Sequence, residues 1–125
     1  MIADYFREVE NILHSCPLTV SVNIHIEIID IDIGYFKAQV KFVDGSELHL
    51  FEFVIIDGKP VVEKYRYHYQ DVRGRLVMRW DNAGHHPEIK TFPNHLHIAD
   101  GIRESKKPEI TNVLLEIVSV IEGGK

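Results

Sequence analysis

The chain of 125 residues has a single cysteine and no long hydrophobic run. Cys16 has no partner for an internal disulfide, so we expect a reducing, intracellular setting. No apolar stretch approaches the roughly 18 residues that a membrane-spanning helix requires. Residues 1–8 also lack the basic flank and the following apolar segment that are typical of a signal peptide. These absences predict a cytoplasmic protein that does not cross a membrane.

Several common binding motifs are absent as well. Gly45, Gly58 and Gly74 belong to separate turns, so the sequence offers no glycine-rich loop for phosphate. Neither H-E-x-x-H nor a pair of C-x-x-C motifs occurs, which removes the most familiar zinc signatures. There is no internal repeat and no low-complexity segment, and the length suits one domain over residues 1–125.

The composition, 45% hydrophobic and 26% charged, is that of an ordinary globular protein. The formal net charge of −5 is unevenly distributed, since residues 1–58 carry a balance of −7 and residues 59–107 a balance of +4. A basic surface would favour RNA, a nucleotide or an acidic partner. A fold that mixes the two segments would cancel this asymmetry.

Apolar side chains recur at helical spacing near both ends of the chain. They predict an amphipathic helix over residues 2–14, ended by Pro17, and a closing helix over residues 108–122. Between these helices the apolar residues alternate with polar ones, as in strands with one buried face. The predicted strands cover residues 19–29, 35–43, 47–56, 60–71 and 75–80, with a sixth, short strand over 95–98.

Short turns join the five strands, including hairpin signals at Asp44-Gly45 and Asp57-Gly58. Successive strands with such turns form an antiparallel meander. We therefore predict an α+β fold, in which a five-stranded, or six-stranded, antiparallel meander sheet has the N-terminal and C-terminal helices packed on one face. The exposed edge strand over residues 19–29 could pair with a second copy in a homodimer.

The fourth predicted strand divides its side chains between two faces. Tyr65, Tyr67 and Tyr69 share one face, and their large apolar rings would pack well against the helices. Alternation alone does not decide which of the two faces meets solvent. With the tyrosines against the helices, Arg66 and His68 would lie on the face without helices, where the long connection after the fifth strand could fold over them.

Residues 81–100 read as that long irregular connection, and its polar groups make it the best candidate for a site. Four of the eight histidines lie there, together with Asp81 and Glu88. Imidazole is the usual proton shuttle near neutral pH and the commonest metal ligand.

Three stretches have a recognisable order and spacing: Y-R-Y-H-Y-Q-D from Tyr65, R-W-D-N-A-G-H-H-P-E from Arg79, and F-P-N-H-L-H from Phe92. In these stretches, and in the lengths of its flanking strands and helices, the chain resembles the TumE-like family of prokaryotic toxins. Gly84 stands where the family often has proline. The resemblance implies a toxin of a toxin–antitoxin module with an antitoxin protein encoded nearby, and it supplies no catalytic residues.

The chemistry of the residues leaves three alternatives open. In the first, the toxin cleaves RNA or acts on a nucleotide without metal, which requires a base, an acid and a cation for phosphate. The candidate catalytic residues are His68, Arg79, Asp81, His85, His86 and Glu88. The candidate substrate-binding residues are Arg66, His95 and His97.

The second alternative is a metal-dependent hydrolase, with a divalent metal bound in the cluster between His85 and His97. Two histidines two residues apart on a strand project to the same side, and a carboxylate completes a three-ligand site. The sequence does not identify a particular cofactor, although a divalent metal is compatible with these residues. The third alternative is a non-catalytic interaction domain, in which the polar groups only brace a loop that binds a partner protein.

Overall fold

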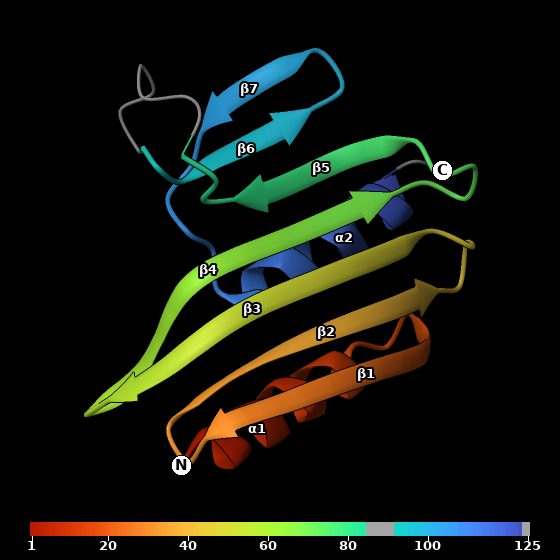
Figure 1. Ribbon diagram of the computed structural model, residues 1–125. Helices are drawn as coiled ribbons and strands as arrows, with labels where there is room; N and C mark the ends of the chain where they lie inside the picture. The colour runs from red at the N-terminus through yellow and green to blue at the C-terminus, as the bar shows by residue number, and fades with distance from the viewer. Residues whose placement is uncertain (85–91, 124–125) are drawn as a thin grey trace.

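The computed structural model describes residues 1–84 and 92–123, and they form one sheet with two helices (Figure 1). The elements in chain order are α1 (Ile2–Ser15), β1 (Thr19–Asp30), β2 (Ile33–Phe42), β3 (Glu47–Asp57), β4 (Lys59–Gln70), β5 (Leu76–Asp81), β6 (His95–Ile98), β7 (Gly101–Glu104) and α2 (Ile110–Gly123). The predicted α+β class is confirmed. Neither helix is both long enough and apolar enough to span a membrane.

The strands form a seven-stranded antiparallel meander in which each pairs with the next along the chain. The five predicted strands and the short sixth strand are present, with ends that differ by at most a few residues. The hairpin turns at Gly45 and Gly58 are also confirmed, since both glycines have positive φ angles of 85° and 72°.

The seventh strand, β7, was not predicted, because the sequence analysis assigned no element to residues 101–107. β7 pairs with β6 through a tight turn, with Ile98 opposite Gly101. Its sequence G-I-R-E has one apolar residue and is largely exposed, so it carries no alternating hydrophobic signal. Pairing with β6, rather than burial, defines it as a strand.

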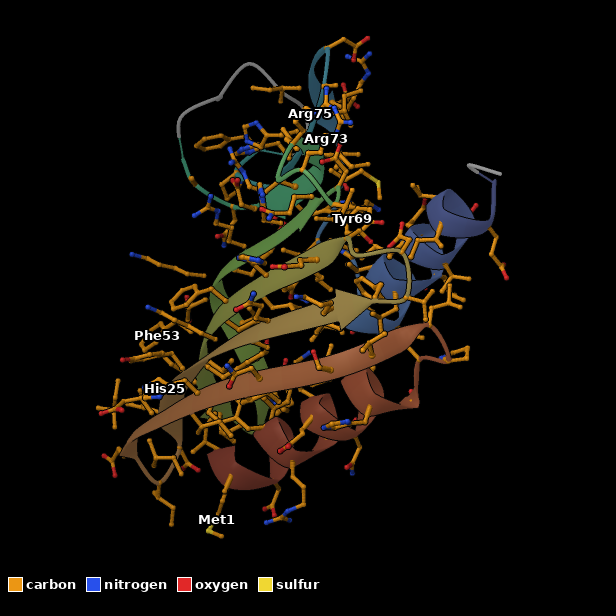
Figure 2. The ribbon with its side chains drawn as sticks, turned by 90° about the vertical axis from the view of Figure 1, so that its right-hand side faces the viewer. Met1, His25, Phe53, Tyr69, Arg73 and Arg75 are labelled. Atoms are coloured by element: carbon orange, nitrogen blue, oxygen red, sulfur yellow. The ribbon has the colours of Figure 1, made fainter. Side chains whose placement is uncertain are left out.

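Both helices cover the same face of the sheet, as Figure 1 shows. Their apolar stripes meet the inward residues of β2 to β5. Tyr65, Tyr67 and Tyr69 are buried there, which is the orientation that the size of their rings favoured. Figure 2 shows His25 and Phe53 on the opposite side of the sheet, turned away from the helices. We call that side the open face.

The predicted one-sided burial of the first strand holds only for its middle. Val22 and Ile24 are half-buried against the core, whereas Val20, Ile26 and Ile28 are exposed. β1 is an edge strand of the sheet, so it has a neighbouring strand on one side alone.

A carboxylic acid, Glu52, lies in the core beneath helix α1 with none of its surface exposed. The hydroxyl of Tyr5 donates to its Oε1 at 2.6 Å, and the hydroxyl of Tyr67 donates to its Oε2. Burial raises the pKa of the Glu52 carboxyl, although these two hydrogen bonds and the charge of Lys107 act in the opposite direction. The folded protein therefore binds a proton at Glu52 more tightly than the unfolded chain does.

Replacement of Glu52 by glutamine should change the pH dependence of stability. Because the pKa of Glu52 is raised in the folded state, its favourable contribution is complete below the ordinary glutamate pKa of about 4.3 and is lost as pH rises through the raised value. The free energy of unfolding of the wild type should thus fall relative to that of Glu52→Gln, by at most about 1.4 kcal/mol per pH unit in that range. Urea denaturation of both proteins between about pH 4 and pH 8 measures this difference. Parallel curves would contradict the assignment, and exposed Glu8→Gln serves as the control.

Candidate active site

A cluster of polar side chains forms where β5 pairs with β6. The register places Arg79 opposite His97 and Asp81 opposite His95. Trp80 lies between Arg79 and Asp81 and packs into the core, so its two neighbours point to the open face. Four of the residues that the sequence singled out are thereby brought together by strand pairing alone.

The carboxylate of Asp81 is the centre of this cluster. Its Oδ1 lies 2.8 Å from Nε2 of His95 and accepts a hydrogen bond from the backbone N–H of Ala83 at 3.1 Å. Its Oδ2 accepts a hydrogen bond from Nε of Arg79 at 3.2 Å and lies 3.4 Å from Nε2 of His97. One carboxylate thus gathers a guanidinium and two imidazoles on a single sheet face.

The second nitrogen of His95 constrains the state of the cluster. Nδ1 of His95 lies 2.9 Å from the carbonyl oxygen of Pro93, which can only accept, so Nδ1 carries a proton. A neutral ring would then place an unprotonated Nε2 against a carboxylate oxygen of Asp81 at 2.8 Å. That contact is attractive only if a second proton or another cation is present between the two groups.

Exposure to solvent differs sharply within the cluster. The side chain of His95 is 1% exposed and that of Asp81 8%, whereas His97 is 12% and Arg79 25% exposed. Arg79 and His97 are therefore the groups within reach of a ligand, with Asp81 and His95 behind them. We interpret His95 as a residue that positions Asp81.

The three groups Asp81, His95 and His97 also have the composition of a metal site. One ligand atom of each lies within 4.8 Å of the others, and two imidazoles with a carboxylate suit zinc, manganese or iron. The guanidinium of Arg79 disfavours metal binding, because its Nε already lies 3.2 Å from Oδ2 of Asp81 and its positive charge would repel a cation there. The three ligand atoms thus suit a metal ion, whereas the positive charge of Arg79 beside Asp81 disfavours one.

Arg66 and His68 lie on the neighbouring strand β4, on the same face. The register sets Arg66 opposite Asp81 and His68 opposite Arg79. Both residues line an open groove of about 770 Å³ over β1 to β4, which also includes His49 and Phe51. The groove and the cluster are therefore adjacent parts of one surface.

His68 is held as a neutral ring. Burial lowers its pKa, and the nearby positive charges of Arg66 and Arg79 lower it further. Its Nε2 lies 3.1 Å from Oε1 of Gln70, which can only accept, so the proton is on Nε2. Nδ1 then carries the lone pair, and it is buried without a hydrogen-bond partner among residues 1–84 and 92–123.

His68, Arg79 and His97 form one cross-strand row on β4, β5 and β6. With strands about 4.8 Å apart, the backbones of the two histidines are roughly 10 Å apart, and Arg79 lies midway between them. A cation flanked by two imidazoles can bind a phosphate and place one proton-transfer group on each side of it.

Three predicted catalytic residues, His85, His86 and Glu88, lie outside the residues that the structure describes. His49 was missed by the sequence reasoning, although it lies opposite His68 with ring centroids 6.1 Å apart. Its signal was an outward position in the third strand, which the sequence presents mainly as apolar.

Removal of the charge of Asp81 should destabilise the fold. Asp81→Asn leaves Arg79 and the imidazoles without their buried counterion, and breaking such a pair costs on the order of 3 kcal/mol. Urea denaturation at neutral pH measures this loss. Asp100→Asn, at a 76% exposed side chain paired with Arg103, is the matched control and should change stability by less than about 0.5 kcal/mol. Equal stability of the two variants would contradict the central place of Asp81.

A comparison with known protein families gives a match over most of the chain. The family model described as Toxin TumE matches residues 9–124, which include all seven strands, helix α2 and the second half of helix α1. No curated protein and no solved structure matches the chain. The match covers most of the sequence and confirms the resemblance seen in its motifs. The chain belongs to the TumE toxin family.

Proposed function

We propose that this toxin cleaves RNA by metal-free acid–base chemistry at the row formed by His68, Arg79 and His97. The observation that supports it most is the convergence of Arg79, His95 and His97 on the carboxylate of Asp81, next to a neutral His68. This arrangement supplies the base, the acid and the phosphate-binding cation that the reaction needs.

In the reaction, a base removes the proton of a ribose 2′-hydroxyl, and the 2′-oxygen attacks the adjacent phosphorus. The bond from phosphorus to the 5′-oxygen breaks, and an acid gives that oxygen a proton. The products are a 2′,3′-cyclic phosphate and a 5′-hydroxyl. His68 is the candidate base because its ring is neutral and its Nδ1 carries the lone pair. Rotation of the ring would bring Nδ1 to the substrate hydroxyl, whose proton it would accept.

His97 is the candidate acid. Its Nε2 is directed at Asp81, as in catalytic dyads where a carboxylate orients an imidazole and stabilises its charged form. The other ring nitrogen, Nδ1, would then exchange a proton with the leaving oxygen. Arg79 is fixed through Nε and presents its terminal amino groups as the fork that binds phosphate, with Arg66 on the next strand as a second cation.

Family membership also leads us to propose an antitoxin protein as the partner of this toxin in the cell. His85, His86 and Glu88 remain candidates for the same chemistry, with His86→Ala expected to remove activity from a folded protein.

His97→Ala should abolish toxicity and leave the protein folded. On induction in bacteria, the wild type should arrest growth and its RNA should accumulate ends with 2′,3′-cyclic phosphate. Loss of one acid–base group should reduce the cleavage rate about 10²- to 10⁴-fold. His14→Ala, at an exposed histidine of α1, is the matched control and should arrest growth like the wild type. Equal soluble amounts of each protein are verified first.

Two outcomes would overturn the proposal. Arrest by soluble His97→Ala at the wild-type level would favour the non-catalytic interaction domain. Cleavage by purified wild type that a chelator abolishes, together with stoichiometric bound metal, would favour the metal-dependent hydrolase at Asp81, His95 and His97.

A further inference from the structure

Three aromatic rings lie together on the open face, away from the helices and the core. Tyr35 is opposite Phe53 in the register of β2 and β3, and the rings of Tyr35 and Phe51 have centroids 6.0 Å apart. All three side chains are half-buried, and Figure 2 shows Phe53 on the side of the sheet opposite the helices. Flat rings presented on an open sheet are the surface on which unpaired bases stack.

Positive charges flank these rings. The register places Lys37 on one side of Phe51 and Arg66 on the other, and both side chains are exposed. Lys64 lies opposite Phe53 in the same way. A ring bordered by cations on neighbouring strands fits a chain that alternates bases with phosphates.

Two carboxylates of this face, on β1 and β3, have cationic or imidazole partners. Glu47 is 3.8 Å from Nζ of Lys41 and 3.0 Å from Nε2 of His49. Glu27 is 3.6 Å from Nε2 of His25 on the edge strand. The centre of the face is therefore basic and aromatic, although the chain as a whole has a net charge of −5.

The aromatic surface is continuous with the candidate active site. Phe51, Arg66 and His68 all line the same groove, and His68 is the first residue of the row that contains Arg79 and His97. From β3 to β6 there are three strand spacings, roughly 14 Å in all. A strand bound on the rings would thus extend towards the proposed point of cleavage.

We propose that the open face of β2 to β4 binds single-stranded RNA, with bases stacked on Tyr35, Phe51 and Phe53 and phosphates held by Lys37 and Arg66. This inference rests on the proposed function and names its substrate as an unpaired strand. A duplex hides the faces of its bases and offers no ring for these aromatics, so it should bind less well.

Binding is tested with the whole protein and a fluorescent single-stranded oligonucleotide carrying 2′-O-methyl groups, which cannot be cleaved through the 2′-oxygen. Fluorescence anisotropy gives the dissociation constant. Phe51→Leu keeps an apolar side chain but removes the stacking ring, and it should weaken binding about tenfold. Leu115→Ala, at an exposed apolar residue of α2, is its control and should bind like the wild type.

A second pair of variants tests the phosphate contacts without risk to the core. Lys37→Gln should weaken binding and lower the slope of log affinity against log salt by about 0.7. Lys59→Gln, at the exposed lysine that begins β4, should change neither quantity. A duplex of the same sequence should compete poorly.

The proposal is overturned if the oligonucleotide shows no saturable binding, or if Phe51→Leu and Lys37→Gln both bind it like the wild type. It is also overturned if an acidic peptide competes as well as the oligonucleotide, because the face would then bind any negatively charged chain regardless of its bases. These outcomes are separate from those for catalysis. Binding lost in Phe51→Leu with no cleavage by the wild type would refute the proposed reaction and keep the RNA-binding face.

Discussion

The architecture of this toxin depends on the pairing register of its antiparallel meander. Successive residues of a strand point to opposite faces, and a slip of one residue would exchange the faces completely. Burial of Tyr67 and Trp80 against the helices fixes the register of β4 with β5. The same pairing forces His68 and Arg79 to the open face, side by side. The energy that folds the sheet therefore also assembles the candidate active site.

Two buried carboxyl groups show how the faces of one sheet create different chemistry. On the helix side, Glu52 lies in the core among tyrosine hydroxyls, and burial favours its protonated form. On the open side, Asp81 is surrounded by a guanidinium, a backbone N–H and two imidazoles. The carboxyl of Glu52 accepts the hydrogen bonds of the tyrosine hydroxyls that are buried in the core. The carboxylate of Asp81 organises charged groups at the surface, where a ligand can reach Arg79 and His97.

Much of the fold could be predicted from the sequence, because alternation along the strands and helical spacing at both ends are strong local signals. The same alternation placed Tyr65, Tyr67 and Tyr69 on the face opposite to Arg66, but only the structure shows which of the two faces is buried. β7 could not be predicted, since four mostly exposed residues become a strand only through their partner β6.

The site could be predicted as a set of residues but not as an arrangement. The sequence placed Asp81, His95 and His97 in one segment, yet the contacts of Asp81 depend on the pairing of β5 with β6. His49 and Phe51 lie far from that segment in the chain, and they enter the surface only because β3 pairs with β4. Which residues of different strands lie side by side depends on the pairing of the strands, and the amino-acid composition does not reveal it.

The central claim is that the row of His68, Arg79 and His97 cleaves RNA through the ribose 2′-hydroxyl. The most direct measurement incubates the purified toxin, in the presence of a chelator, with a single-stranded oligoribonucleotide and with its fully 2′-O-methylated counterpart. We expect the ribonucleotide to be cut to fragments with 2′,3′-cyclic phosphate ends and the methylated strand to stay intact. Equal cleavage of both strands, or an intact ribonucleotide, would contradict it.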